Sequence, residues 1–374
     1  MAKDTESMMK IGMAADGSLP LPWLADALAR AARLAGAHAL LIHGPAGAGH
    51  FEFALLLAQA VLCEAPGAAA AGRPCGRCAS CHLMASRTHP DLRTVLPAAL
   101  RVQLGWTDEA DYLPPKGEAK PSREIRIEQV RLAIAWSQQT SARGRGKVLL
   151  LHPADAVNTV SANALLKTLE EPPGTVRLLL TSTDPEHLLP TVRSRCQRLP
   201  LALPDTAQAL AWLQAQGVAD AEPLLALAGG SPLEALAWAQ EGLAGPALAA
   251  LPRRVAAGDA SALAGQTIPR VVELLLKLAH DAQVLAAGGA PRFFAAGHLP
   301  TGADLAALRV WQQALQRTAR HDEHPWNAGL LIESLVTQAA AVWPRAAGRP
   351  APPAGSFGAS FGAARSGASL HSAR

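Results

Sequence analysis

Four of the five cysteines in the 374-residue chain lie between positions 63 and 81. Cys75, Cys78 and Cys81 follow one another at every third position, and Cys63 lies upstream across a segment rich in alanine and glycine. Four thiolates suit tetrahedral Zn²⁺, and a shell that they complete leaves no open position for catalysis. The spacing therefore predicts a structural zinc site, with an iron–sulfur cluster or unrelated free thiols as alternatives.

A glycine-rich turn between an apolar run and a helical pattern has the spacing of a phosphate-binding loop. Gly44, Gly47 and Gly49 fit such a loop, whose backbone N–H groups would face a phosphate. His50 stands where these loops have the lysine that reaches the β- and γ-phosphates, and Phe51 replaces the hydroxyl that binds Mg²⁺. We therefore expect no ATP hydrolysis at this loop, and residual nucleotide binding stays an open alternative.

The next apolar run lacks the acidic residues that a P-loop ATPase needs to hold its metal ion. Residues 148–151 lead into His152 and Pro153, and the first carboxylate after them is Asp155. Losses in two separate motifs indicate a chain that keeps the architecture of a nucleotide-binding domain without its catalytic groups.

The elements that must position these residues alternate between strand and helix patterns in the first half of the chain. Buried strands are predicted at 39–43, 148–151 and 176–180. Amphipathic helices are predicted at about 51–63, 125–139 and 162–169. This alternation predicts an α/β fold with a parallel sheet that helices cover on both faces.

The second half of the chain has alanine- and leucine-rich helical patterns and no strand patterns. The predicted domains are an α/β P-loop-type domain over 1–203 with an inserted zinc module at about 63–85 and a surface insertion at about 97–122, a small helical domain over 204–244, an all-α domain over 245–345 and a disordered tail over 346–374.

Composition excludes two broad classes of protein. A net charge of +4 with 17% charged residues is too small to indicate a protein that coats nucleic acid by itself. The chain has no apolar run long enough for a membrane span and no signal-peptide pattern, so we expect a cytoplasmic protein without membrane contact.

The segment from Ser161 to Gly174, which includes Leu-Leu-Lys-Thr-Leu-Glu-Glu-Pro-Pro, resembles bacterial clamp-loader subunits of the AAA+ class. Ser194-Arg195-Cys196 follows it, as in that family. The degenerate loop, the cysteine cluster after its helix and the Thr-His-Pro-Asp sequence ending at Asp91 are similar to the non-hydrolysing DNA polymerase III subunits of this family. The resemblance covers about residues 20–240 and implies an AAA+ domain, a helical lid and a helical collar.

The resemblance also implies a role for Arg195, an arginine finger acting in trans. Its guanidinium would neutralise charge on the γ-phosphate of ATP bound by a neighbouring subunit. The alternative is a solvated basic edge that includes Arg193 and Arg198. Lys167 and Glu171 have the spacing of a surface ion pair, although this helix end could instead face a subunit interface or DNA.

The expected partners follow from the same resemblance. They are the motor subunit (gamma/tau), the delta subunit, the sliding clamp and primed DNA at replication forks in the nucleoid, within the DNA-directed DNA polymerase (nucleotidyltransferase) holoenzyme. We expect no enzymatic activity from the isolated chain and structural zinc as its only bound cofactor. The rival interpretations are an ATPase active in its own site and a stand-alone zinc protein that binds nucleic acid.

Overall fold

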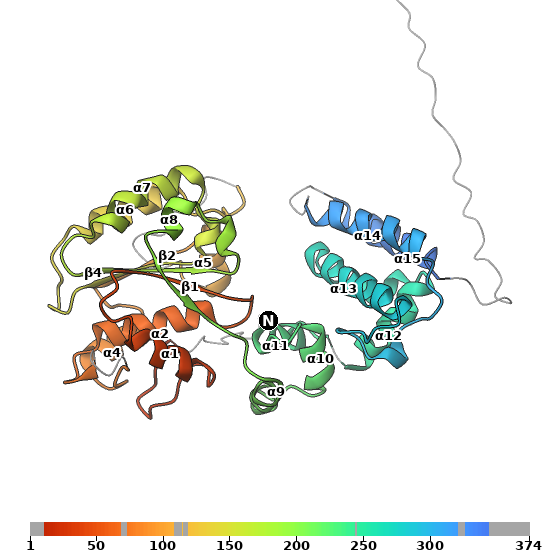
Figure 1. The fold of residues 1–374 in the computed structure, drawn as a ribbon, viewed down its shortest axis with the longest axis horizontal. Coiled ribbons are helices and arrows are strands. Elements are labelled where there is room, and N and C mark those ends of the chain that lie inside the picture. Colours follow the sequence, from red (N-terminus) through yellow and green to blue (C-terminus); the bar gives the residue numbers. More distant parts are fainter. Residues whose placement is uncertain are drawn as a thin grey trace, which may run out of the picture. The chain divides into compact units, whose positions relative to one another are not determined.

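The computed structural model describes residues 11–68, 73–107, 114, 119–243, 245–320 and 326–343 (Figure 1). Within these ranges the chain forms two compact units. The first comprises the described residues of Met1–Ala250 together with Pro291–His298, and the second comprises those of Leu251–Ala290 together with Leu299–Arg374.

A parallel five-stranded sheet forms the centre of the first unit. Its strands are β1 (Ala39–His43), β2 (Leu92–Val95), β3 (Lys147–Leu151), β4 (Val176–Ser182) and β5 (Gln197–Pro200). The strand order is β2-β3-β4-β1-β5, and every adjacent pair is parallel. The central strands are buried on both faces, which explains their continuous apolar sequences and confirms the predicted parallel sheet.

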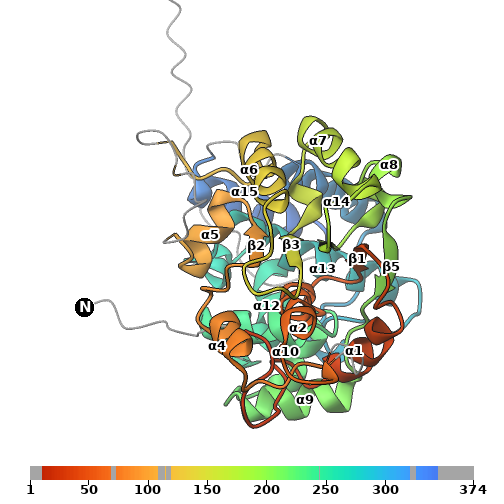
Figure 2. The same cartoon turned by 90° about the vertical axis from the view of Figure 1, so that its left-hand side faces the viewer.

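Helices cover both faces of this sheet (Figures 1 and 2). On one face, α1 (Leu24–Ala32), α2 (His50–Leu62) and α4 (Ala79–Ala85) pack around a core that includes Leu40, Ile42 and most of α2. On the other face lie α6 (Ile127–Ser137), α7 (Thr159–Glu170) and α8 (Pro190–Arg193), over a core that includes Leu41 and Leu149. Short 3-10 helices lie at Ala154–Ala156 and Pro185–His187.

One short helix lies at the start of the range 97–122, where a surface insertion was predicted. Helix α5 (Ala98–Leu104) lies within that range, and its Arg101 is fully buried. Arg101 Nη2 donates to the carbonyl of Thr94 on β2 at 2.7 Å, so the helix packs against the edge of the sheet. The start of this range is therefore packed against the sheet, through a buried guanidinium that binds strand backbone.

Two hydrogen bonds connect the chain segments on either side of the rest of this range. Ala99 N donates to the carbonyl of Ser122 at 2.9 Å. Gln129 Nε2 donates to the carbonyl of Leu96 at 2.8 Å. Both ends of this excursion therefore lie side by side at the sheet edge, while part of the predicted insertion lies outside the described residues.

Three helices follow the sheet in the first unit: α9 (Thr206–Ala215), α10 (Ala221–Leu227) and α11 (Pro232–Gln240). Asp205 and Ser231 cap the first and last of them by accepting hydrogen bonds from backbone N–H groups. Trp212 of α9 packs edge-to-face on Trp23, with ring centroids 5.3 Å apart. This contact joins the three helices to the segment before α1.

The second unit is helical in its described residues. Helix α12 (Gly245–Ala256), which begins in the first unit, leads into α13 (Ile268–Ala286), α14 (Leu305–Ala319) and α15 (Ala328–Ala340), with a short 3-10 helix at Ala260–Leu263 on the way. Another short 3-10 helix, at Ala296–His298, belongs to the first unit. Trp311 is buried in this unit and donates its Nε1–H to the carbonyl of Leu335 at 2.9 Å. No described helix combines the length and the apolar character that a membrane crossing requires.

The predicted domain boundaries at 203, 244 and 345 stay predictions. The predicted tail over 346–374 lies outside the described residues.

Candidate functional site

The glycine loop has the backbone of a phosphate-binding loop. It follows β1 and ends at Gly49, the residue before α2. Gly47 and Gly49 have φ values of 76° and 91°, a left-handed conformation that side chains disfavour. The predicted strand–loop–helix context of Gly44, Gly47 and Gly49 is therefore present in the structure.

Neighbouring groups press closely on this loop. A methyl group added at Gly47 would lie 1.8 Å from Ser231 Oγ, and one at Gly49 would lie 2.4 Å from Leu21 Cδ1. Ser231 begins α11, so the helical part of the first unit places its hydroxyl directly against the loop. The loop thus needs its glycines for packing, whether or not it binds a phosphate.

Aromatic rings occupy the first turn of α2. His50 and Phe51 are each only 5% exposed. Phe51 stacks on His152 at the end of β3, with centroids 4.4 Å apart and an interplanar angle of 12°. Trp106 lies on the same ring at 5.4 Å. Where a working loop presents a hydroxyl to Mg²⁺, this chain presents a packed aromatic cluster.

The histidines of this cluster are neutral at physiological pH. Burial lowers the pKa of His50, and burial together with neighbouring His50 lowers the pKa of His152 to about 3. His152 Nδ1 lies 2.7 Å from Thr181 Oγ1, a contact that fixes the ring. Neither imidazole therefore supplies the positive charge that the missing lysine would give to a bound phosphate.

The nearest carboxylates also have structural partners. Asp155 accepts a hydrogen bond from Ser182 Oγ at 2.5 Å and another from Thr183 N at 2.9 Å. Glu52 lies in the first turn of α2, and burial raises its pKa. The structure thus gives Asp155 a role in holding the end of β4.

The four predicted zinc ligands lie together at the other end of α2. The Sγ atoms of Cys63, Cys75, Cys78 and Cys81 all lie within 4.8 Å of one another. Two of the S···S distances are 3.8 Å and 3.9 Å. A tetrahedral site with Zn–S bonds of about 2.3 Å has S···S edges of about 3.8 Å. The cluster therefore fits structural zinc, as the spacing predicted.

Backbone N–H groups point at these sulfurs and favour their thiolate forms. Cys75 Sγ accepts from Arg77 N at 3.4 Å and from Cys78 N at 3.3 Å, and these contacts lower the pKa of Cys75 to about 6. Cys78 Sγ accepts from Cys81 N at 3.4 Å and caps α4. Burial raises the pKa of Cys63 and Cys81, so a bound metal ion would have to favour the thiolate forms of these two against their burial.

The Thr-His-Pro-Asp sequence connects the cysteine module to the sheet. His89 Nε2 lies 2.9 Å from Ser80 Oγ, which itself donates to the carbonyl of Leu62 at 2.6 Å. The fully buried carboxylate of Asp91 accepts hydrogen bonds from Ala142 N at 2.7 Å and Arg143 N at 2.8 Å. These side chains hold the module in place rather than forming a catalytic set.

Arg195 lies away from the loop, just after α8. Its Nε donates to Glu170 Oε1 at 2.7 Å, and its Nη2 donates to the same oxygen. Its Nη1 donates to the carbonyl of Thr191 at 2.8 Å. The side chain is 32% exposed, so solvent or a neighbouring protein can reach the guanidinium. Sequence reasoning missed Glu170 as its partner because 25 positions separate the two residues.

The neighbours of Arg195 differ from their sequence-based interpretations in one respect. Cys196 is buried, and burial raises its pKa to about 12, so this thiol is packed and unreactive. At the end of α7, Glu170 forms an ion pair with Arg195, and no ion pair joins the side chains of Lys167 and Glu171 among the described residues. Of the two alternatives for Lys167 and Glu171, the side-chain ion pair is thus not formed, and the two residues are joined by the backbone hydrogen bond from Glu171 N to the carbonyl of Lys167 at 2.9 Å. The alternative of an interface at this helix end stays a prediction.

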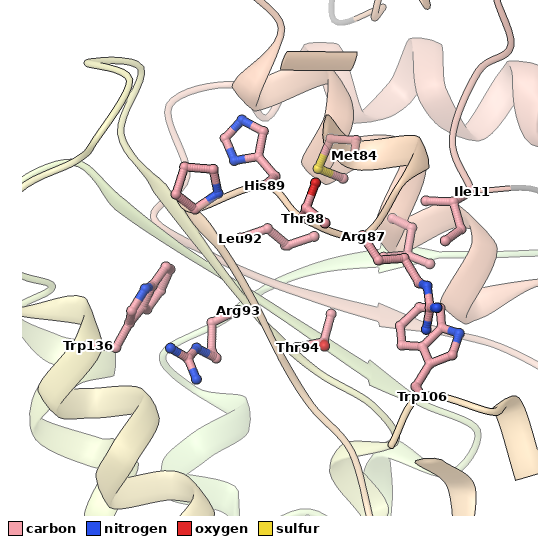
Figure 3. Close-up of a pocket in the computed structure, with 12 residues that line it drawn as sticks. Ile11, Met84, Arg87, Thr88, His89, Leu92, Arg93, Thr94, Trp106 and Trp136 are labelled. Carbon is pink, nitrogen blue, oxygen red and sulfur yellow. The ribbon is translucent and has the colours of Figure 1, made fainter. Parts of the chain in front are cut away.

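A pocket of about 230 Å³ at the edge strand β2 has no counterpart in the sequence-based prediction (Figure 3). Arg87 lies over Trp106 at 5.1 Å at one end, and Arg93 lies over Trp136 at 5.5 Å at the other. Arg87 has a φ of 60°, in the left-handed region. None of the described residues lining the pocket is acidic. The sequence gives no signal for it because its residues come from separate elements.

Comparisons with known proteins match the region that contains these features. Residues 26–205 match the family described as DNA polymerase III, delta subunit. The chain is 44% identical to DNA polymerase III subunit delta' of Pseudomonas aeruginosa over 204 residues, or 53% of this chain and 55% of the relative. It is 34% identical to the Escherichia coli subunit delta' over 208 residues, or 55% of each chain.

A more distant similarity extends further along the chain. DNA polymerase III subunit tau of Escherichia coli is 32% identical over 252 residues, which are 66% of this chain and 33% of the relative. The chain spans about half the length of the delta' relatives that it matches. Over the α/β region that carries the glycine loop, the cysteine cluster and Arg195, the chain is similar in sequence to the delta' subunits of DNA polymerase III.

Proposed function

We propose that this chain acts as the delta' subunit of the DNA polymerase III clamp loader and does not hydrolyse ATP itself. The observation that carries the second part is the stack of Phe51 on His152, which fills the first turn of α2 with rings. Neutral His50 stands beside it in place of the lysine. An AAA+ subunit of this kind contributes to catalysis only through the site of a neighbour.

Arg195 is the residue through which the chain would act. A guanidinium keeps its charge at every physiological pH and can bind phosphate oxygens with two parallel hydrogen bonds. Arg195 is accessible at the surface, in the Ser-Arg-Cys context shared with clamp-loader subunits. It would stabilise the charge on the γ-phosphate of ATP bound by the motor subunit (gamma/tau).

The proposed assembly places this chain between the motor subunit and the delta subunit. The helices of the second unit would join a collar with the helices of its neighbours. The complex would open the sliding clamp and place it on primed DNA, with phosphate contacts shared among several subunits. Zinc at the four cysteines would stabilise the small module rather than take part in the reaction.

The test is reconstitution of the complex with Arg195→Ala. One interface among several would lose its finger, so we expect about a tenfold or larger fall in the clamp-loading rate, with DNA-stimulated ATPase also reduced. Arg198→Ala is the matched control, because Arg198 is an exposed arginine on the adjacent strand β5. Unchanged loading by the Arg195 variant would refute the proposed role.

A second measurement separates this proposal from an active ATPase. The isolated chain should show no turnover of ATP, and its addition to the motor and delta subunits should raise theirs. Turnover by the isolated chain that disappears in a Gly47→Val variant would show that the loop itself is active.

A further inference from the structure

The guanidinium of Arg195 is engaged at all three nitrogens with oxygens of its own subunit. Two nitrogens donate to Glu170 Oε1, and the third donates to the Thr191 carbonyl and reaches Ser194 Oγ at 3.5 Å. A phosphate bound in a neighbouring site cannot receive the same N–H groups while these contacts persist. To bind a phosphate with two parallel hydrogen bonds, the arginine must therefore exchange at least one of these partners.

The position of Glu170 on its helix is unfavourable for an acid. Glu170 is the last residue of α7, where the helix dipole places partial negative charge. The guanidinium of Arg195 offsets that repulsion. The acid is thus explained by its contact with Arg195 and not by the stability of the helix that carries it.

The ion pair between Arg195 and Glu170 is also weak enough for a phosphate to replace Glu170. The two side chains are 32% and 48% exposed, and exposed ion pairs contribute little to stability. Both donors from Arg195 reach the same oxygen of Glu170, whereas a phosphate offers two oxygens to the same fork. An arriving γ-phosphate can therefore replace the carboxylate with better geometry.

We propose that Glu170 is a positioning residue that holds Arg195 against its own subunit and competes with ATP for it. This inference rests on the proposed role of Arg195 as a finger in trans. When the neighbouring site is empty, the carboxylate keeps the guanidinium in a defined place. When ATP binds there, the carboxylate has to be displaced, and this displacement weakens the apparent affinity of that site for ATP.

The test uses complexes reconstituted from full-length subunits with Glu170→Gln or Glu170→Ala. Both changes remove the competing charge, and an exposed ion pair corresponds to a factor of up to about five in an equilibrium constant. We expect the KM for ATP to fall about two- to fivefold while kcat changes by less than about twofold. Glu171→Ala is the matched control, because Glu171 is exposed beside Glu170 and has no contact with Arg195 among the described residues.

The outcomes separate this inference from the proposed function. An unchanged or higher KM in the Glu170 variants would overturn it, as would a fall in kcat like that of Arg195→Ala. If Arg195→Ala lowers loading and the Glu170 variants match wild type, only the competition is refuted. If Arg195→Ala itself matches wild type, the finger and the competition are refuted together.

A measurement on the isolated full-length chain tests the contact without the partners. Phenylglyoxal modifies accessible guanidinium groups, and peptide mass spectrometry can follow the rate at Arg195. We expect Glu170→Ala to raise that rate about two- to fivefold, with Glu171→Ala unchanged. Equal rates in wild type and Glu170→Ala would show that the carboxylate does not hold the guanidinium in solution.

Discussion

The two ends of helix α2 differ in what they have kept. At its N-terminal end, the glycine loop retains the backbone of a phosphate site, while His50 and Phe51 are packed among rings. At its C-terminal end, Cys63 belongs to a complete set of four thiols with tetrahedral spacing. The difference shows that residues needed for folding persist in this chain, whereas those needed only for hydrolysis are absent.

The largest expected effect is at the cysteine end. Cys81→Ser, or removal of metal with a chelator, should unfold the module, because it has little core of its own and structural zinc contributes on the order of 10 kcal/mol of apparent binding energy. Metal analysis should give one zinc per wild-type chain. Cys196→Ser is the control, since Cys196 lies outside the cluster. If the wild-type chain contained no zinc under reducing conditions, the four cysteines would not be a structural zinc site.

The next effect is at the aromatic stack. Phe51→Ala should reduce the free energy of unfolding by about 3 kcal/mol, because it removes a buried ring and leaves a cavity beside His152. Chemical denaturation measures this change. The double variant His50→Lys with Phe51→Thr should be destabilised too and should still show no ATP turnover. Turnover in that variant would mean that the site lacks only these two residues.

Gly47 offers a smaller and more local test. Gly47→Ala should cost about 2–3 kcal/mol, because its methyl group would overlap Ser231 Oγ and its φ of 76° disfavours a side chain. Gly17→Ala is the matched control, with a φ of 86° and open space around it. It should cost only about 1 kcal/mol. Equal losses in thermal denaturation would show that Ser231 does not press on the loop.

The smallest effect is a dependence of stability on pH. The folded pKa of His152 is about 3, and the unfolded histidine titrates near 6.5, so the unfolded chain binds more protons below pH 6.5. Stability should therefore be full above pH 6.5 and decrease as pH falls toward 3, by about 2 kcal/mol at pH 5. His152→Gln should flatten this part of the curve. An identical pH profile in both proteins would place the titrating group elsewhere.

The interior of the sheet was predictable from the sequence, and its edges were not. Runs such as Leu40-Leu41-Ile42 have no polar residue, because central parallel strands are buried on both faces. The edge strands β2 and β5 were missed, since they contain Arg93 and Arg198 in only four residues each. Four residues are too few for an alternating apolar pattern to be recognised as a strand.

The candidate sites show the same division between local and distant information. The cysteine ligands were predictable because three of them are close in sequence, and because structural zinc needs a fourth ligand, for which Cys63 was available. The stack of Phe51 on His152 and the pairing of Glu170 with Arg195 were not predictable. Each joins residues from separate elements whose approach depends on the packing of the whole sheet.

The hydrogen bond from Ala99 to Ser122 has a consequence for how the chain tolerates changes of length. The excursion between these residues begins and ends at one place on the sheet edge, and its first part, α5 with Trp106, is packed against the sheet and Phe51. The entropy of closing a loop grows only with the logarithm of its length, and doubling it costs about 0.6 kcal/mol. Residues added after Trp106 and before Ser122 should therefore cost little, which makes this part of the chain a suitable place to insert a tag or a reporter domain.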